Sequence, residues 1–280
     1  MRASTLRVAI LCSTRAPGLD FLVRDPARGM LYEVVCCLTS HEESAAVREG
    51  LRAGIPFLVH PIHDFCRARG KSVFDIDLRQ EYDAMTVKLL AEFRPDLVVM
   101  SSYLLILTEP MLSSFRGRIL NIHDSDLTLR NVDGSPRYVG LRSVRDAVFA
   151  GETETRATLH LANEVLDNGP LFLRSWSFPI SPLTRDARAW EATDVLKAYA
   201  YAHREWMLRS AWGPLMAASL KLLASGRARL GSNIVSVDGI PGPFDLDRRE
   251  LWAGHLDDGL IPHVRTGSLA RSSLPLEAIS

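Results

Sequence analysis

Two polar side chains end an apolar segment near the middle of the chain. Asn121 and His123 lie two residues apart in Arg118–His123, which is otherwise rich in Ile and Leu. In a strand, residues two apart point to the same side, so an amide and an imidazole would project into one cleft. An amide can donate hydrogen bonds to a developing negative charge, and an imidazole moves protons near neutral pH. The pattern also fits a strand end whose polar side chains only form hydrogen bonds with the backbone of a neighbouring loop.

Short apolar runs alternate with helical patterns over the first two-thirds of the chain. The runs are nearly continuous in Val, Ile and Leu, which is typical of strands buried on both faces of a parallel sheet. Helical spacing separates them, most clearly in Asp77–Phe93, where Pro95 ends the pattern. This order predicts an α/β fold with a doubly wound, mostly parallel sheet and helices on both faces. The predicted strands are Leu6–Leu11, Tyr32–Ser40, Pro56–Pro61, Asp96–Ser102 and Arg118–His123.

The second half of the chain predicts a hairpin, a long helix and an irregular end. The runs Ala157–Val165 and Pro170–Ile180 are joined by Asp167-Asn168-Gly169, which predicts pairing at one end of the sheet. Residues 190–225 predict a helix that is interrupted at Trp212-Gly213-Pro214. The last fifty residues, rich in Gly, Pro and Asp, show no periodicity. We therefore expect one α/β domain over residues 1–225 and an irregular C-terminal extension over residues 226–280.

Composition predicts a cytoplasmic protein with neither nucleic acid nor a membrane as a partner. The 33 basic residues balance the 33 acidic ones, unlike the one-sided charge of a nucleic-acid binder. No apolar stretch approaches the ~20 residues that span a bilayer, and the apolar N-terminal run is too short for a signal peptide. The four cysteines have no C-x-x-C spacing, which fits a reduced compartment.

Three short motifs follow one another along the chain. They are Asn121–Ser125 (N-I-H-D-S), Thr158–His160 (T-L-H) and Leu166–Pro170 (L-D-N-G-P). In this order they resemble the motifs N-I-H-P-S, T-V-H and L-D-x-G-P of the formyltransferase family, which includes glycinamide ribonucleotide transformylase. The resemblance covers about residues 6–230, and 202–214 resembles the family's closing helix.

The resemblance implies an enzyme that transfers a formyl group from the cosubstrate 10-formyltetrahydrofolate to an amine, without a metal. It implies that Asn121 donates to the oxyanion of a tetrahedral intermediate and that His123 moves the proton. Asp167 is expected to hold His123 or an ordered water, and His160 to support the loop that carries Asp167. As an alternative, His160 is a structural histidine.

The resemblance also implies where the folate binds. It is expected to lie against Tyr103, Leu104, Leu105, Ile106 and Leu107, with Asn163 and Val165 on the other side. Without the resemblance, residues 104–107 would fit a buried corner between a strand and a helix.

The turn after the first strand departs from the family pattern. The family's glycine-rich G-x-G-S-N turn binds a phosphate through backbone amides. Here Ser13–Gly18 keeps one glycine, and Pro17 removes a backbone donor. Ser13, Thr14 and Arg15 are candidate acceptor-binding residues, but weak activity is expected on glycinamide ribonucleotide. The acceptor therefore stays open between a molecule of that kind and another small amine. The turn also lacks G-x-G-x-x-G, which argues against a nicotinamide cofactor.

Two further departures lie beyond His123. Asp124 stands where the family has proline, and its charge would favour the imidazolium of His123 if the two side chains approach closely. The loop Asp126–Val139 is longer than usual and carries Arg137, a second candidate for acceptor binding. A surface insertion without function is the alternative for this loop.

One other activity, a non-catalytic role and one assembly state also fit the same sequence. Water in place of the amine would make the chain a formyltetrahydrofolate hydrolase that releases formate. A non-catalytic folate-binding relative is the other alternative. Residues at helical spacing (Trp206, Met207, Trp212 and Met216) predict a packing face, with a homodimer as one possibility.

Overall fold

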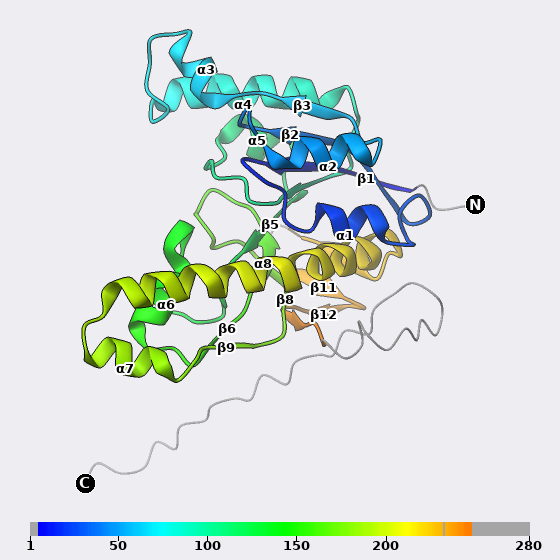
Figure 1. Cartoon of the computed structure of the whole chain (residues 1–280). Coiled ribbons are helices and arrows are strands. Elements are labelled where there is room, and N and C mark those ends of the chain that lie inside the picture. The colour runs from blue at the N-terminus through cyan, green and yellow to red at the C-terminus, as the bar shows by residue number, and fades with distance from the viewer. Residues whose placement is uncertain (1–4, 232, 248–280) are drawn as a thin grey trace.

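Eight strands form the central sheet of the computed structural model, which describes residues 5–231 and 233–247 (Figure 1). The strand order is β13-β8-β7-β5-β4-β1-β2-β3. The parallel part consists of β1 (Leu6–Cys12), β2 (Tyr32–Thr39), β3 (Phe57–Val59), β4 (Leu97–Met100) and β5 (Ile119–His123). Each of these strands lies within a predicted one or extends it by one residue. The predicted α/β class with its mostly parallel sheet is therefore confirmed.

The predicted hairpin is also confirmed, and it extends the sheet beyond β5. β7 (Thr158–Leu161) runs antiparallel to β5, and β8 (Leu171–Arg174) runs antiparallel to β7. The hairpin places Asn121 directly opposite His160 and His123 opposite Thr158. Side chains at opposite positions on neighbouring strands lie within reach of one another. The pairing therefore brings two of the three sequence motifs together.

Helices cover both faces of the sheet because alternate residues of each strand point in opposite directions. Val8, Ile10 and Cys12 of β1 pack into a core with α1 (Leu19–Arg24), α2 (Ala45–Arg52), α6 (Ser143–Ala150), α7 (Leu183–Ala189) and α8 (Thr193–Ala224). Ala9 and Leu11 pack on the other face with α4 (Ile76–Ala91) and α5 (Glu109–Ser114). The remaining short elements are α3 (Ile62–Arg67), a 3₁₀ turn η1 (Gly140–Arg142) and the strand pair β6 (Glu154–Thr155) and β9 (Phe178–Pro179).

The predicted interruption of the long helix is wrong, because α8 runs without a break through Pro214 (Figure 1). A proline inside a helix costs about 3 kcal/mol. That cost is offset by burial, since every residue from Ala211 to Leu220 is buried. Gly213 is in the helix because α1 passes close by: a Cβ there would lie 2.4 Å from the Cβ of Phe21. The Trp-Gly-Pro sequence is thus a packing feature of the helix.

Short strands follow α8. β10 (Ala228–Leu230), β11 (Val235–Val237) and β12 (Ile240–Pro241) form a small antiparallel sheet, and β13 (Phe244–Asp245) adds to the central sheet beside β8. Regular structure therefore continues past residue 225. The division of the chain at that position stays a prediction, and 248–280 of the expected extension lie outside the described residues.

Position 169 in the β7–β8 turn has no room for a side chain, because a Cβ on Gly169 would lie 1.8 Å from the carbonyl oxygen of Leu161. Gly169→Ala should therefore lower the free energy of unfolding by about 3 kcal/mol, as overpacking at a rigid site does. The control is Gly134→Ala, since Gly134 has a positive φ of 81° but no atom near its missing Cβ. It should cost only about 1 kcal/mol. Urea unfolding measures both, and an equal loss in the two variants would contradict the steric argument.

Candidate active site

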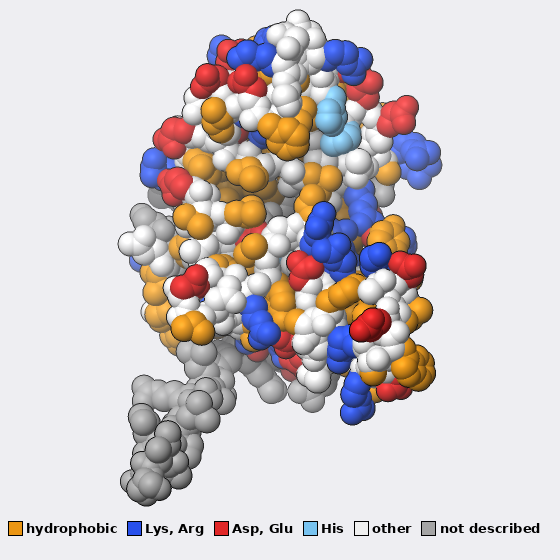
Figure 2. Space-filling view, turned by 90° about the vertical axis from the view of Figure 1, so that its left-hand side faces the viewer, with side chains coloured by type: hydrophobic (Ala, Val, Ile, Leu, Met, Phe, Trp, Pro, Cys, Tyr) orange, Lys and Arg blue, Asp and Glu red, His pale blue; other side chains and the backbone are white. Residues whose placement is uncertain are grey.

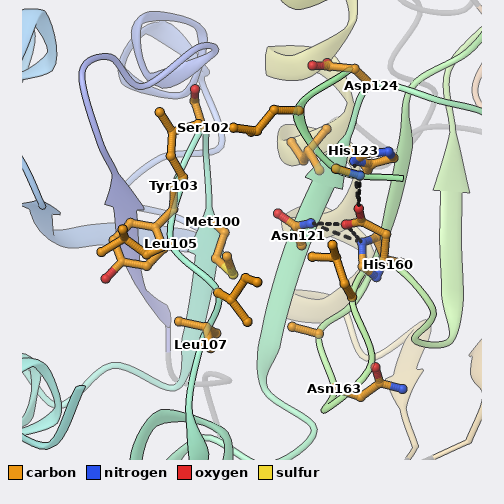
Figure 3. Close-up of a pocket in the computed structure, with 18 of the residues that line it drawn as sticks. Met100, Ser102, Tyr103, Leu105, Leu107, Asn121, His123, Asp124, His160 and Asn163 are labelled. Atoms are coloured by element: carbon orange, nitrogen blue, oxygen red, sulfur yellow. Dashed lines mark hydrogen bonds and ion pairs between the residues drawn. The ribbon is translucent and has the colours of Figure 1, made fainter. Parts of the chain in front are cut away.

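The carboxyl ends of β4 and β5 open into a cavity, called here the central cavity (Figure 3). Ligands of open α/β sheets bind at this edge. The loop after β4 forms one wall, and the segment between β7 and Asp167 forms the other. The cavity is lined by Met100, 102–107, 121–124, Gly140, Leu141, His160, 162–167, Arg204 and Trp212.

Asn121 contributes its amide to two acceptors at the base of this cavity. Its Nδ2 lies 3.1 Å from Nε2 of His160 and donates to Oδ1 of Asp167 at 3.3 Å. His160 Nδ1 lies 2.8 Å from the carbonyl oxygen of Leu161, so this nitrogen carries the proton and Nε2 accepts from Asn121. His160 thus fixes the orientation of the Asn121 amide.

His123 is buried at the end of β5, and both ring nitrogens have partners. Nε2 lies 3.0 Å from the carbonyl oxygen of Tyr138, and Nδ1 lies 3.4 Å from Oδ2 of Asp167. A carbonyl can only accept, so Nε2 carries the proton of the neutral ring. Nδ1 is then the basic atom, and Asp167 lies where it can stabilise the imidazolium that protonation creates.

Asp167 joins the two motifs from the other side of the cavity. Its backbone is left-handed, with φ of 52°, a conformation that Asp tolerates better than most residues. This turn directs the carboxylate inward, where Oδ2 accepts the backbone N–H of Gly140 at 2.8 Å. The structure therefore brings together Asn121, His123, Asp167 and His160, the residues that the three motifs supply (Figure 3).

Burial and neighbouring groups shift the pKa values of His123 and Asp167 in opposite directions. Burial lowers the pKa of His123 below its usual 6.5, although Asp167 and Asp124 raise it. The imidazolium expected from Asp124 is therefore not the favoured form. Burial would raise the pKa of Asp167, but the His160 and His123 rings and the Gly140 N–H together lower it. At neutral pH the site holds a neutral imidazole beside a carboxylate.

The loop expected to bind folate forms the opposite wall (Figure 3). Leu104 and Ile106 are 40% and 67% exposed, whereas Tyr103 and Leu107 are buried beneath them. The loop is therefore anchored in the core by Tyr103 and Leu107 and offers the apolar side chains of Leu104 and Ile106 to a flat ring. Leu105 is half-buried and also lines the cavity. On the facing wall, Asn163 accepts from the backbone N–H of Val165 at 3.0 Å, and both residues line the cavity.

Two buried residues of α4 hold the same loop, and sequence reasoning missed them. Arg79 donates from Nη2 to the carbonyl oxygen of Ile106 at 2.6 Å. Asp83 Oδ2 accepts from the backbone N–H and the hydroxyl of Thr108, at 2.6 and 2.8 Å. Burial raises the pKa of Asp83, against the lowering by these hydrogen bonds. An Arg and an Asp four apart on a helix suggest a surface ion pair, so the sequence carries no signal for this role.

The first turn does not reach the central cavity. Ser13 is buried, where its Oγ lies 2.7 Å from that of Ser40 and accepts the backbone N–H of Leu104 at 3.0 Å. Thr14 is exposed. Arg15 donates to both carboxylate oxygens of Glu205, at 2.9 and 2.6 Å, beside a second hollow. Ser13 therefore supports the loop that is expected to bind folate, while Arg15 is bound to Glu205 of α8.

Asp124 and Arg137, the candidates beyond His123, lie in different places. Asp124 is buried and lines the cavity, where it accepts from Arg204 Nε at 2.6 Å and from Trp212 Nε1 at 3.0 Å. Arg137 is exposed, lies 3.1 Å from Glu152 and does not line the cavity. Only Asp124 is positioned to influence a ligand there directly.

Comparison with known proteins identifies the family of this chain. A family model described as formyl transferase matches residues 6–194. The chain belongs to the formyl transferase family. The trifunctional purine biosynthetic protein adenosine-3 of Drosophila melanogaster is 31% identical over 179 residues, which are 63% of this chain and 12% of that protein. The phosphoribosylglycinamide formyltransferase of Haemophilus influenzae is 28% identical over 234 residues, which are 83% of this chain and 94% of that protein.

Solved structures support the fold. The phosphoribosylglycinamide formyltransferase of Coxiella burnetii superposes with a TM-score of 0.64 at 23% identity, over 86% of this chain and 97% of that one. A formyltetrahydrofolate deformylase from Pseudomonas syringae gives 0.57 at 20% identity, over 84% of this chain and 66% of that one. The predicted family and enzyme class, a formyltransferase, are confirmed. The individual site residues remain predictions.

The lowered pKa of His123 predicts a pH profile. If neutral His123 is the base, kcat/KM should fall only below pH 6.5, as the pH passes through the lowered pKa. Asp167 raises that pKa, so Asp167→Asn should move the acid limb to still lower pH and reduce the maximal rate. Asp146→Asn, on the exposed side of α6, is the control and should leave the profile unchanged. An acid limb that moves to higher pH in Asp167→Asn would exclude this assignment.

Proposed function

We propose that this chain transfers a formyl group from 10-formyltetrahydrofolate to a small amine. The observation that carries the proposal is the convergence of an amide and an imidazole from β5 with a carboxylate from the loop before β8, at 3.3 and 3.4 Å. These groups face an apolar wall across one cavity. An acyl transfer through a tetrahedral intermediate requires this combination of donor, proton acceptor and supporting charge.

The reaction begins when the amine nitrogen attacks the formyl carbon of the folate. The carbonyl becomes an oxyanion, and the C–N bond to the folate then breaks as that nitrogen takes a proton. His123 Nδ1 accepts the proton of the attacking amine and returns it to the leaving nitrogen. Asp167, whose Oδ2 lies 3.4 Å from Nδ1, stabilises the imidazolium between these two steps. The products are a formamide and tetrahydrofolate, with no net gain or loss of protons.

Asn121 supplies the oxyanion donor in this mechanism. Both of its amide hydrogens have acceptors in the structure, at 3.1 Å on His160 and 3.3 Å on Asp167. Donation to an oxyanion therefore requires the longer contact to open while His160 keeps the amide oriented. His160 is thus proposed as a positioning residue, and the folate lies against 103–107 and the 163–165 segment.

A hydrolase uses the same groups if water takes the place of the amine. The deformylase from Pseudomonas syringae shares the fold, which is why this activity is kept as the second candidate. Release of formate from 10-formyltetrahydrofolate without an amine identifies the hydrolase. A non-catalytic folate-binding protein would release neither formate nor tetrahydrofolate.

In this proposal the protein acts in the cytoplasm. Its partner is a small molecule, and it binds neither nucleic acid nor a membrane. Basic and acidic side chains are interspersed on the face seen in Figure 2. None of the helices among the described residues combines the length and the apolar character of a membrane span.

Met207, Trp212 and Met216 are buried within the chain, and Trp206 is 40% exposed. A homodimer therefore remains a hypothesis that rests on Trp206 alone among those four residues.

The assigned roles predict large losses of turnover. His123→Ala should lower kcat by about 10²–10⁴-fold, because a positioned acid–base group contributes that much. Asn121→Ala should cost about 10²–10³-fold through the lost oxyanion donor. The double variant should be little worse than the weaker single one, since both groups act on one intermediate.

Tetrahydrofolate release with the best amine of a panel measures these rates, and titration with a folate analogue measures binding separately. His63→Ala is the matched control, because His63 is exposed and does not line the cavity. Near-normal turnover in His123→Ala would show that the cavity serves another reaction or none.

The first turn predicts weak activity on glycinamide ribonucleotide. Pro17 offers no backbone donor, and Arg15 is tied to Glu205, so a phosphate meets few free donors there. We expect kcat/KM for this ribonucleotide to lie below that of another amine in a broad panel. Finding it to be the best acceptor, with a low KM, would overturn the prediction.

A further inference from the structure

Arg204 is the single Arg or Lys among the described residues that line the central cavity. It comes from α8, and its side chain is 23% exposed. The cation of the first turn, Arg15, faces the second hollow instead and is bound by both oxygens of Glu205. Any fixed positive charge that the walls of the central cavity offer to a ligand is therefore that of Arg204.

Asp124 and Trp212 fix the position of this guanidinium. Arg204 Nε donates to Asp124 Oδ2 at 2.6 Å, and Trp212 Nε1 donates to Oδ1 of the same carboxylate at 3.0 Å. Asp124 and Trp212 are buried, so the arrangement has little freedom. Among the described residues, the Arg204 side chain makes no hydrogen bond other than the one from Nε to Asp124. The two terminal nitrogens, Nη1 and Nη2, keep their hydrogens for another acceptor.

The place of this group separates it from the folate wall. Asp124 follows His123 directly at the end of β5, whereas Leu107 and Asn163 lie at the opposite end of the view in Figure 3. A folate that packs on 104–107 and reaches His123 with its formyl group leaves the Asp124 end for the acceptor. Arg204 therefore lies on the acceptor's side of the reacting atoms.

We propose that the amine acceptor carries an oxyanion group, a carboxylate or a phosphate, and that Arg204 binds this group. The inference rests on the proposed function, since it concerns the acceptor of that reaction. A guanidinium presents parallel N–H donors that match two oxygens of such a group. Asp124 and Trp212 are positioning residues in this arrangement, because they hold the guanidinium before the acceptor arrives and so reduce the entropy lost on binding.

Three amines of similar size test the charge requirement: ethanolamine is uncharged apart from its amine, β-alanine adds a carboxylate and 2-aminoethyl phosphate adds a phosphate. Dissociation constants are measured by ligand-observed NMR, with and without a saturating folate analogue. In the wild-type protein, at least one anionic amine should bind at least tenfold more tightly than ethanolamine. The comparison of β-alanine with 2-aminoethyl phosphate then distinguishes a carboxylate from a phosphate acceptor.

Substitutions at Arg204 assign the preference to this side chain. Arg204→Gln should reduce the difference between anionic and neutral amines to less than about threefold, while Arg204→Lys should retain part of it. Arg209→Gln is the matched control, since Arg209 lies on the same helix but lines the second hollow. Unchanged affinity for the folate analogue shows that each variant is folded. Should Arg204→Gln unfold, Arg204→Lys still tests the proposal through the size of the preference.

The outcomes separate this inference from the proposed function. Equal binding of the three amines to the wild type, or a full preference that persists in Arg204→Gln, overturns the assignment of Arg204 even if tetrahydrofolate is released. A preference that depends on Arg204 supports the assignment even if no amine is formylated, in which case the proposed transfer reaction fails by itself.

Discussion

The buried carboxylate of Asp167 connects four segments of this chain. It accepts from Asn121 of β5 and from the backbone of Gly140, and it lies within 3.4–3.7 Å of the rings of His123 and His160. A carboxylate in such a place is stable only when its oxygens have partners, so the positions of these segments depend on one another. The left-handed turn at Asp167 is what directs the carboxylate inward. The geometry of the loop around Asp167 and the pKa of His123 therefore both depend on this one side chain.

A second buried carboxylate, that of Asp124, directly follows β5 and connects the sheet to α8. Asp124 holds Arg204 and Trp212, while Arg15 of the first turn holds Glu205 on the same helix. The helix is thus tied to both the sheet and the first turn. These ties fix the part of α8 that carries Arg204 and Trp212 to the wall of the central cavity.

Much of the sheet was predictable because buried parallel strands are continuous apolar runs, and β1, β2, β4 and β5 all have this pattern. The convergence of Asn121, His123, His160 and Asp167 was predictable from three ordered motifs. The rest depends on long-range contacts that leave no local pattern. Arg15 meets Glu205 across 190 positions, and Asp124 meets Arg204 across 80. The two-residue strand β13 is too short for any periodicity, and Pro214 was misjudged because local helix propensity ignores the burial of α8.

The hydrogen bonds between α4 and the loop after β4 have a consequence for how this protein can change. Arg79 and Asp83 hold the carbonyl oxygen of Ile106 and the backbone N–H of Thr108, atoms that every non-proline residue possesses. The path of the loop is therefore largely independent of which side chains it displays at Leu104 and Ile106. Mutations at these two positions can reshape the surface met by the ring of a ligand without loosening the scaffold beneath it. Such a surface can diverge rapidly, while the fold and the polar groups on the opposite wall of the cavity stay the same.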